Sequence, residues 1–377
     1  MKVAFLSYGY IEYCIQQANG LARECDVLLM LPRDEAAAHV ADLDPAVRYC
    51  PFDKPRLRQP LRQMAAIGRM LREIHRFRPN VIHFQQGHMW FNLALPLLRP
   101  YPLVLTIHDP RYHAGDRDSR RTPQSLMDFG FRRAGRVIVH GESLKQQVIG
   151  LLSIAADRVH VVPHVAIGSL DAPTEVRDDA KTILFFGRIW DYKGLQYLIE
   201  AEALISGVTP DARIVIAGQG DDFEPYRRLM KRPERFEVHN HFIATQERDE
   251  LFARASVVVL PYVEATQSGV IPLAYSFAKP VVATRVGALA DAVEDGVTGR
   301  LVPPRNVEAL AAAINELLAD RAKRVAMGAA GRRKLESDWS PKAVAKQLVD
   351  VYSRAIADRH ATARAGIAVS HLATETT

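Results

Sequence analysis

The sequence predicts an α/β protein with two doubly wound domains that face each other across a cleft. Its length of 377 residues exceeds what one hydrophobic core usually fills, so two domains are expected. Short apolar runs alternate with helix-length amphipathic stretches almost from end to end, and this β-α-β alternation is typical of parallel sheets. The short runs are apolar on both faces, as in strands that are covered by helices on both sides. These observations together indicate two Rossmann-like sheets, whose ligands bind at the carboxyl ends of the strands.

The candidate strands are short and rich in Val, Ile and Phe. Those in the first half of the chain are Val3–Leu6, Val27–Met30, Val81–Phe84, Leu103–Ile107, Arg136–Val139 and Val159–Val162. Those in the second half are Thr182–Phe186, Arg213–Ala217, Val238–Ile243, Ser256–Leu260 and Pro280–Ala283. The helix-length segments between them include Leu61–Phe77, Leu195–Ile205, Val270–Ala278 and Val307–Ala319.

A change in composition places the boundary between the domains near residues 165–180. The apolar periodicity stops there and Gly, Pro and Asp accumulate, which is typical of a linker. We therefore expect one domain over residues 1–170 and a second over residues 171–339, joined by a hinge.

The chain is expected to end in one more helix and a tail. A helix is predicted over residues 340–358, because Ser340 can cap it and Pro341 suits its first turn. Residues 359–377 are mostly small and polar, so a flexible tail is expected there.

Composition argues against several classes of protein. Hydrophobic residues make up 48% and charged residues 24% of the chain, which excludes wholesale disorder. No apolar run approaches the roughly 20 residues that span a bilayer, and the first residues lack the length and cleavage site of a signal peptide. Cys14, Cys25 and Cys50 are odd in number and show no Cys-x-x-Cys spacing, unlike a disulfide framework or a zinc site. A soluble, cytoplasmic protein is expected.

The net charge of +6 lies in the first half of the chain. Residues 1–172 hold 22 Lys and Arg against 16 Asp and Glu, whereas residues 173–377 hold 27 of each kind. The stretch Arg56–Arg78 is the most basic, and such a patch favours an anionic partner.

The apolar residues from Leu61 to Phe77 fall mostly on one helical face, with arginines on the remainder. This pattern fits either a solvated helix face or a surface that binds anionic lipid. The second interpretation would place the protein on the inner face of the cytoplasmic membrane. A nucleic-acid partner is not expected, because no recognition module or aromatic-basic interleaving accompanies the arginines.

A glycine and two cations follow the first predicted strand of the second domain. Gly187 and Arg188 come directly after the strand, and Lys193 precedes a helix that begins near Gly194. Glycine lets the backbone turn sharply beside a ligand. Two fixed cations and a helix N-terminus would form a site for a diphosphate, although two surface cations in a loop are the simpler alternative.

A second polar cluster follows the strand Ser256–Leu260. Thr266 and Gln267 offer neutral groups suited to sugar hydroxyls, and Ser268 can cap the next helix. The backbone amides at Ser268 and Gly269 would then point toward an anion. A simple helix cap would explain Ser268 but not the polar side chains before it. The two clusters together predict one diphosphate held between two cations and a helix N-terminus.

These motifs resemble those of the retaining glycosyltransferases of GT-B architecture that form family 4. The resemblance covers nearly the whole chain and is specific through the order and spacing of its motifs. They are Phe186–Arg188 with Lys193–Gly194, Ile216–Gly220, Leu260–Tyr262, Lys279–Thr284, Val286–Gly287 and Glu294–Pro304. The resemblance implies that Arg188 and Lys193 neutralise the diphosphate of a nucleotide-sugar donor without a metal.

The resemblance also assigns roles to the first domain, which would hold the acceptor while the second holds the nucleotide sugar. His108 would contact the transferred sugar, and Gly9 would admit the donor phosphate. Asp116 and Asp118 form a DxD-like motif that binds metal in another glycosyltransferase architecture. They lie in a polar loop, so no metal site is expected.

The chain departs from the family where members usually carry two glutamates eight positions apart. Those positions are Ala265 and Leu273 here, and Leu273 cannot bind the donor ribose as the second glutamate does. Glu264 lies one residue from the first position and is a candidate contact for the donor sugar. The sequence leaves open whether it replaces the missing glutamate. The run Ala-Thr-Gln-Ser-Gly at Ala265–Gly269 resembles a variant within the family, so the departure is expected to be a subgroup trait.

The resulting hypothesis is a hexosyltransferase of polysaccharide biosynthesis. It would move a sugar from a nucleotide donor to a glycan or polyprenyl-linked saccharide with retention of configuration. Cations on the departing diphosphate would stabilise the transition state. No pair of carboxylates is placed for double displacement, so the resemblance implies attack on the same face. Two alternatives stay open: a nucleotide-sugar 2-epimerase, which needs carboxylates poised for elimination, and a non-catalytic sugar-nucleotide-binding protein.

Overall fold

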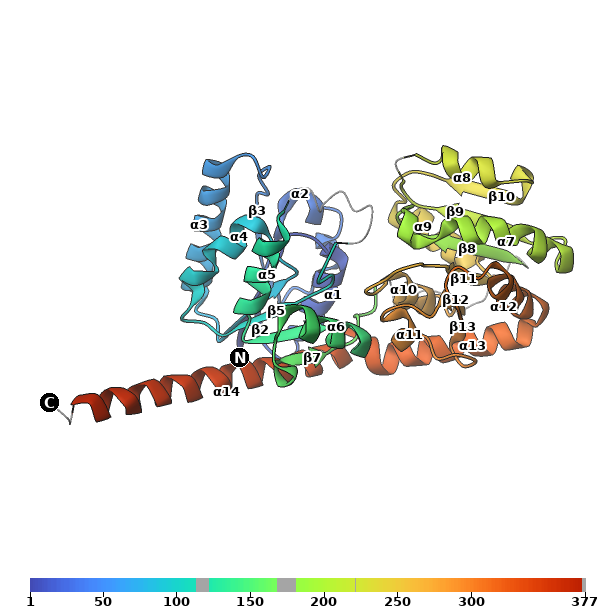
Figure 1. Cartoon of the computed structure of the whole chain (residues 1–377). Helices are drawn as coiled ribbons and strands as arrows, with labels where there is room; N and C mark the ends of the chain where they lie inside the picture. The colour runs from blue at the N-terminus through green and yellow to red at the C-terminus, as the bar shows by residue number, and fades with distance from the viewer. Residues whose placement is uncertain (113–121, 168–180, 221, 375–377) are drawn as a thin grey trace.

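The computed structural model contains two parallel β-sheets, one in each half of the chain (Figure 1). The structure describes residues 1–112, 122–167, 181–220 and 222–374. The predicted boundary at residues 170–171 and the motif Asp116–Asp118 lie outside the described residues. The α/β class and the two Rossmann-like sheets are confirmed.

The first sheet has the strand order β3-β2-β1-β4-β5-β6-β7. Its strands are β1 (Lys2–Ser7), β2 (Asp26–Pro32), β3 (Arg48–Phe52), β4 (Val81–Gln85), β5 (Leu103–Thr106), β6 (Arg136–Val139) and β7 (Val159–Val161). The sequence analysis missed β3, because Arg48 and Pro51 weaken its strand pattern. An edge strand tolerates proline, since one side of its backbone has no neighbouring strand to bond.

The second sheet has the order β10-β9-β8-β11-β12-β13. Its strands are β8 (Thr182–Phe186), β9 (Arg213–Ala217), β10 (Phe236–His239), β11 (Val257–Leu260), β12 (Val281–Thr284) and β13 (Gly299–Val302). The edge strand β13 was missed because it is short and begins with glycine. The edge strand β10 was predicted as Val238–Ile243, but the chain leaves the sheet after His239.

Helices cover both faces of each sheet, as the apolar strands require. The helices of the first half are α1 (Ile11–Leu21), α2 (Arg33–Ala36), α3 (Pro60–Phe77), α4 (Met89–Ala94), α5 (Gln124–Arg133) and α6 (Glu142–Leu152). Those of the second half are α7 (Leu195–Val208), α8 (Glu224–Leu229), α9 (Thr245–Arg254), α10 (Val270–Ser276), α11 (Leu289–Ala292), α12 (Val307–Ala319), α13 (Arg321–Lys334) and α14 (Pro341–Thr374).

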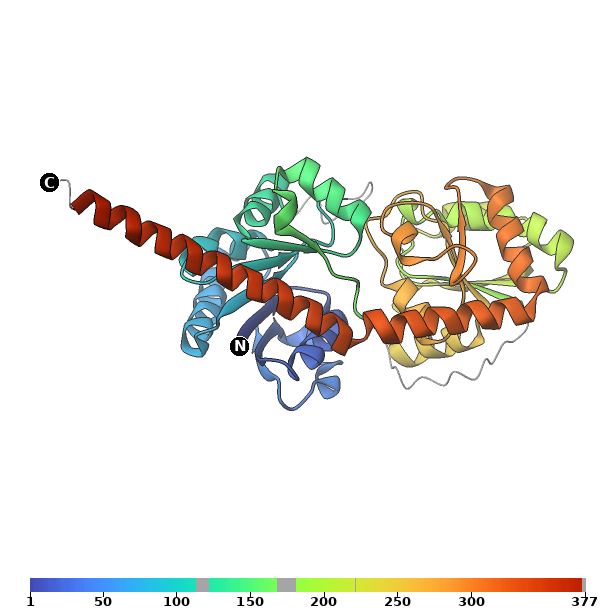
Figure 2. The same cartoon turned by 90° about the horizontal axis from the view of Figure 1, so that it is seen from below.

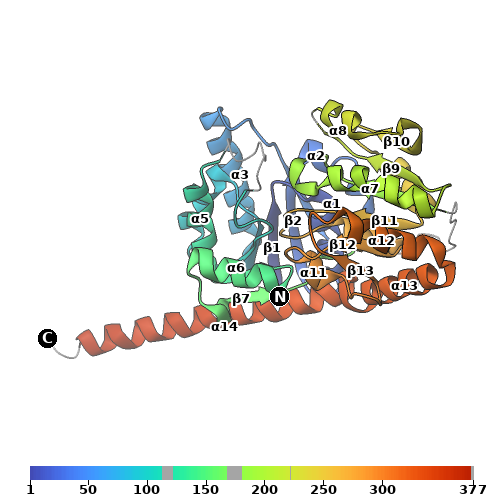
Figure 3. The same cartoon turned by 45° about the vertical axis from the view of Figure 1, so that its right-hand side comes forward.

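Helix α14 returns from the second half of the chain to the first sheet. Figures 1 and 3 show the two domains side by side, with α13 and α14 along their common lower side. Seen from below, α14 crosses the first domain (Figure 2). It packs on α1, and the buried Tyr352 hydroxyl lies 2.6 Å from Nδ1 of His83 in β4. This contact ties α14 to β4, the central strand of the first sheet.

Helix α14 is longer than the sequence predicts. We expected the helix to end at residue 358 and a flexible tail to follow, but the helix continues to Thr374. Residues 359–374 contain several alanines and no proline, so nothing in their composition stops a helix. Among the described residues, no helix combines the length and the apolar character needed to cross a membrane.

Candidate active site

A cavity of about 440 Å³ lies between the two domains, at the carboxyl ends of both sheets. On the first domain its lining includes Tyr10 and Glu12, beyond β1, and Asp109, beyond β5. On the second domain the loop after β8 and residues 266–269 after β11 line it. This is the edge at which doubly wound sheets bind ligands, because parallel strands end there together.

The loop after β8 carries the two predicted cations on a backbone that requires glycine. Gly187 has φ +117°, a conformation that other residues rarely adopt. Gly194 has φ +65°, and a Cβ there would lie 2.0 Å from the carbonyl oxygen of Pro261. The two glycines therefore fix the path of the segment that contains Arg188 and Lys193. Arg188 is exposed, and its guanidinium lies 3.9 Å from the ring centroid of Trp190.

Lys193 is an unusually buried cation, with 9% of its surface exposed. Its Nζ donates to the Tyr262 hydroxyl at 2.7 Å and lies 3.9 Å from the centroid of that ring. Burial, reinforced by the neighbouring Arg188 guanidinium, lowers the pKa of Lys193 from 10.5 to about 7. An anion between the two cations would favour the charged form of Lys193. The positive charge at this site therefore favours binding of an anion.

The loop after β11 brings neutral polar groups to the same wall. The Ser268 Oγ lies 3.3 Å from the Tyr262 hydroxyl and accepts a bond from the backbone N–H of Val270, at the start of α10. The buried Oε1 of Gln267 has no hydrogen-bond partner among the described residues. Buried polar atoms are normally satisfied, so this oxygen is available to a donor group on a ligand.

Two side-chain contacts join the domains across the cavity. The Thr266 hydroxyl donates to the carboxylate of Asp109. Arg248 on α9 donates to the carboxylate of Glu12 on α1, with Nη1–Oε2 3.0 Å. All four residues line the cavity, so these contacts hold its two walls together.

His108 lies behind this wall, at the end of β5, and is fully buried. Its Nε2 is 2.9 Å from Oε1 of Gln85, and the Tyr10 ring stacks on it with centroids 3.9 Å apart. Burial, followed by the nearby His140, holds the pKa of His108 well below its usual value, so the ring is neutral. Because an amide oxygen can only accept, Nε2 carries the proton and Nδ1 is an acceptor. That Nδ1 has no partner among the described residues.

The structure does not bring every predicted residue to the cavity. Arg188, Lys193, Thr266, Gln267, Ser268 and Gly269 line it. Glu264 is exposed and lies outside the lining. Gly9 also lies outside the lining, between the buried Tyr8 and the exposed Tyr10, and a Cβ there would meet no atom within 4 Å. His108 is fully buried and also lies outside the lining.

Sequence reasoning missed several residues that line the cavity or hold its lining in place. Glu12 and Arg248 are 236 positions apart, so no local pattern pairs them. Tyr262 was noted only as part of a family motif, although its hydroxyl bonds both Lys193 and Ser268. Leu273 lines the cavity and is buried, so an apolar side chain stands at the position where the family resemblance leads one to expect a glutamate.

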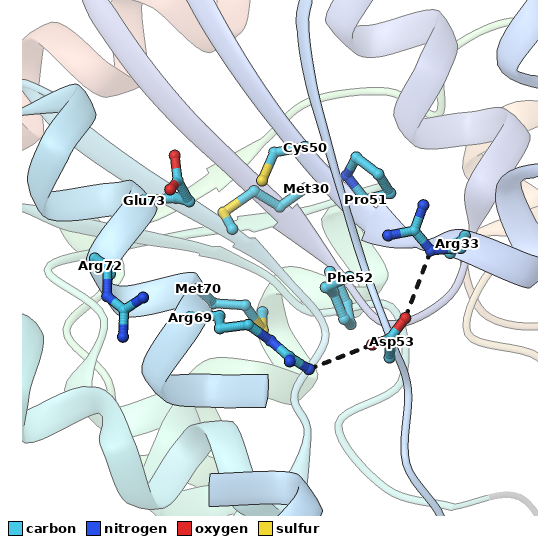
Figure 4. A pocket seen from close by; sticks show the side chains of 10 residues that line it. All are labelled: Met30, Arg33, Cys50, Pro51, Phe52, Asp53, Arg69, Met70, Arg72 and Glu73. Atoms are coloured by element: carbon cyan, nitrogen blue, oxygen red, sulfur yellow. Dashed lines mark hydrogen bonds and ion pairs between the residues drawn. The ribbon is translucent and has the colours of Figure 1, made fainter. Parts of the chain in front are cut away.

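A second cavity, of about 340 Å³, lies on the first domain away from these residues (Figure 4). Its basic side chains include Arg33 and Arg69, which lie 3.5 and 3.3 Å from the carboxylate of Asp53 between them. The carboxylate offsets much of their charge. This cavity is lined in part by α3 and shares no lining residue with the interdomain cavity.

Side chains with the spacing of a metal site occur outside the interdomain cavity. Within the residues that the structure describes, one group of His and Glu has the spacing of a metal site, namely His239, His241 and Glu247. None of the three lines the cavity.

Comparisons with known proteins identify the fold and the family. Residues 11–165 match the family "Glycosyltransferase Family 4", and residues 180–320 match the family "Glycosyl transferases group 1". A D-inositol 3-phosphate glycosyltransferase of Pseudarthrobacter chlorophenolicus is 30% identical over 309 residues, which covers 75% of this chain and 72% of that protein.

Solved structures of the same architecture resemble nearly the whole chain. The sucrose-phosphate synthase of Thermosynechococcus elongatus superposes with a TM-score of 0.75 at 20% identity, covering 95% of this chain and all of the other. The Anabaena protein HepE, solved in complex with UDP, gives a TM-score of 0.72 at 19% identity over 94% of this chain and all of its own. These matches do not favour a 2-epimerase or a non-catalytic binding protein. The chain belongs to glycosyltransferase family 4 and is a glycosyltransferase of the GT-B fold.

Proposed function

We propose that this enzyme transfers a hexosyl group from a nucleotide-diphosphate sugar to a glycan or a lipid-linked saccharide, with retention of anomeric configuration. The observation that carries the proposal is the pairing of Arg188 with the buried Lys193 in the interdomain cavity. The HepE structure with UDP supports a nucleoside diphosphate as the donor's leaving group.

Two cations match the charge that develops when the diphosphate leaves. In a water-poor cleft, fixed positive charges stabilise a developing anion more than they would in water. Arg188 offers several N–H donors in one plane, whereas the Lys193 ammonium acts as a point charge. In this mechanism the two side chains do the work of a divalent cation, so the transfer is metal-independent.

The transferred sugar would lie against neutral groups. The Thr266 hydroxyl, the Gln267 amide oxygen and the acceptor Nδ1 of His108 suit sugar hydroxyls. The exposed Glu264 is outside the cavity lining, which favours Thr266 and Gln267 over Glu264 as sugar contacts. The backbone at Ser268 and Gly269 would bind the diphosphate from the side opposite the two cations. Gly9 would leave room for the donor phosphate, because a Cβ there would meet no atom within 4 Å.

Retention follows most simply from attack on the same face as the departing diphosphate. A double displacement would need a carboxylate at the reacting carbon. The cavity-lining carboxylates Glu12 and Asp109 both accept bonds from the opposite domain, from Arg248 and Thr266. These bonds hold the carboxylates in the contact between the domains, which favours the same-face route.

The acceptor is proposed to lie in or on an anionic membrane surface reached by α3. The sequence pattern placed Leu61 and Met64 on the apolar face with Phe77, but they are 80% and 63% exposed among the arginines. Helix α3 buries Gln63, Ala66, Ile67, Met70, Ile74 and Phe77, so Phe77 is on the buried face and Leu61 and Met64 are not. Exposed apolar side chains between basic ones suit the boundary between lipid headgroups and acyl chains.

Nucleotide release tests the transferase proposal. The purified protein is incubated with UDP-, GDP- and dTDP-sugars, with and without saccharide acceptors, and release of nucleoside diphosphate is followed. We expect release with one base, and we expect Lys193→Met to abolish it. Lys231→Met, which removes an exposed lysine outside the cavity, should leave it unchanged. Release by Lys193→Met at the wild-type rate would refute the assigned diphosphate site.

Vesicle binding tests the membrane part separately. Wild-type protein should co-sediment with vesicles that contain phosphatidylglycerol, and the double variant Arg62→Glu, Arg72→Glu should not. The matched control is Arg227→Glu, Arg228→Glu, which makes the same charge change on exposed residues of the second domain. Equal loss in both double variants would show that net charge alone is responsible and would overturn a role for α3.

A further inference from the structure

Two histidines and a glutamate converge at the end of β10, outside the proposed transfer site. One ligand atom from each of His239, His241 and Glu247 lies within 4.8 Å of the others. The Nδ1 of His239 is 2.9 Å from Oε1 of Glu247, and Nε2 of His241 is 3.0 Å from Oε2 of the same carboxylate. We propose that these three side chains bind one divalent metal ion of the Zn²⁺ class.

The kinds and spacing of the atoms fit that metal. Zn²⁺ takes imidazole nitrogens and carboxylate oxygens, and three protein ligands leave a fourth position to water. Two ligands of a tetrahedral zinc, each about 2.0–2.1 Å from the ion, lie about 3.3 Å apart. Oε1 of Glu247 lies 2.9 Å from Nδ1 of His239 and 3.1 Å from Nε2 of His241, near that separation, and the two histidine nitrogens lie within 4.8 Å of each other. Side-chain rotations would therefore admit an ion.

A second carboxylate supports the arrangement from behind. Oε1 of Glu237 lies 2.7 Å from Nε2 of His239, the nitrogen that faces away from Glu247. Arg254 holds Glu237 in turn, with Nη2–Oε2 3.0 Å. A carboxylate on the far nitrogen of a metal-binding histidine places the proton there and directs the other nitrogen's lone pair at the metal. Glu237 is thus a positioning residue.

The metal would connect the sheet edge to the cavity wall. The ligands come from β10, from the loop after it and from α9 (Figure 1). Between His241 and Glu247 the chain contributes Phe242, Ile243 and Thr245 to the cavity lining. An ion would therefore fix residues 240–245 at both ends. It would take no part in the reaction, since its ligands lie outside the cavity.

Zinc binding to the full-length protein tests the proposal without any nucleotide. After chelator treatment and dialysis, titration calorimetry with Zn²⁺ alone should show one tight site per chain. His241→Ala and Glu247→Gln should lose that site, and Glu237→Gln should weaken it about 10- to 100-fold. His75→Ala removes an exposed histidine of α3 and should bind as the wild type does.

Two further measurements distinguish lost zinc binding from lost folding and locate the effect of the ion. His241 is exposed, so its substitution should leave the melting temperature of the zinc-free protein unchanged and separate lost binding from lost folding. Hydrogen exchange of residues 240–245 should slow when Zn²⁺ is added to the wild type and not to His241→Ala. If wild type and His241→Ala bind zinc equally, or neither binds it, the proposal is wrong. None of these results depends on the proposed transfer reaction.

Discussion

Arg248 of the second domain bonds both carboxylate oxygens of Glu12 of the first, at 3.2 and 3.0 Å. The arginine side chain is 10% exposed and also bonds Asp249, so the pair is largely shielded from solvent. It lies in the wall of the interdomain cavity. The same side chains that line the interdomain cavity therefore hold the two domains together. If the donor binds in this cavity as proposed, the ion pair should affect donor binding.

Glu12→Gln should weaken donor binding without touching the diphosphate cations. The amide keeps the shape of the carboxylate but removes the charge that pairs with Arg248, and we expect about a tenfold loss of nucleotide affinity, or about 1.4 kcal/mol. Titration calorimetry gives the affinity, and small-angle scattering should show a larger radius of gyration in the variant. Glu24→Gln, at an exposed position of the first domain, is the control. Unchanged nucleotide affinity in Glu12→Gln would show that the Glu12–Arg248 ion pair does not contribute to donor binding.

Donor affinity should fall as pH rises above 7. Burial and Arg188 lower the pKa of Lys193 to about 7, and a bound diphosphate raises it again, because the ammonium then has an anionic partner. Below pH 7 the ammonium is already formed. Above it, binding must take up a proton, so the affinity falls by up to about tenfold per pH unit until the pKa of the complex is reached.

Calorimetry between pH 7 and 9 measures this slope, a range in which the terminal phosphate of a nucleoside diphosphate is mostly ionised. Repeating the titration in buffers of different ionisation enthalpy counts the protons taken up. An affinity that stays flat from pH 7 to 9 would contradict the assignment of Lys193.

Lys193→Met should stabilise the protein, most strongly at low pH. The folded-state pKa of about 7 lies below the ordinary lysine value of 10.5, so the unfolded chain binds more protons between those values and stability rises with pH there. Below pH 7 the fold carries a buried charge, and methionine removes it. The melting temperature of the variant should exceed that of the wild type at pH 6, with a smaller difference at pH 10. A lower melting temperature at pH 6 would mean that the ammonium stabilises the fold.

The fold could be predicted because its signals are local. β11 is apolar throughout and β8 is apolar after Thr182, and each is followed by turn residues and a helix. The edge strands β3 and β13 were not predicted, because edge strands tolerate proline and glycine, which weaken the strand pattern of a sequence. The extension of α14 to Thr374 was not predicted, because a stretch of small residues rich in alanine is compatible with both a tail and a helix.

The site could be predicted only where its residues are neighbours along the chain. Gly187, Arg188 and Lys193 follow one strand, so their position at the sheet edge could be inferred. The contact between Thr266 and Asp109 joins residues 157 apart and depends on how the domains meet. The burial that lowers the pKa of Lys193 comes from tertiary packing, which no sequence pattern reports.

Leu273 should make the enzyme tolerant of the sugar of the nucleotide. Its buried side chain lines the cavity where the family resemblance places a ribose-binding glutamate, and an alkyl group forms no hydrogen bond with a ribose hydroxyl. We expect a nucleoside diphosphate and its 2′-deoxy analogue to bind within about threefold, because a site with no polar partner hardly rejects the analogue that lacks the hydroxyl. Competition titration measures the ratio. A strong preference for the ribose form would indicate another ribose contact.

His108→Ala should slow transfer while leaving nucleoside diphosphate binding intact. The neutral ring presents the acceptor Nδ1, and loss of one hydrogen bond to a sugar hydroxyl costs about 1–3 kcal/mol, or about 5- to 160-fold in rate. Because His108 is fully buried and Tyr10 stacks on its ring, the proposed contact requires neighbouring side chains to move when the donor binds. His108→Asn can place an amide oxygen near the position of Nδ1 and should recover part of the rate. Turnover and nucleotide affinity are compared in both variants. Equal losses of rate and affinity would show that His108 acts through packing and not through a contact with the sugar.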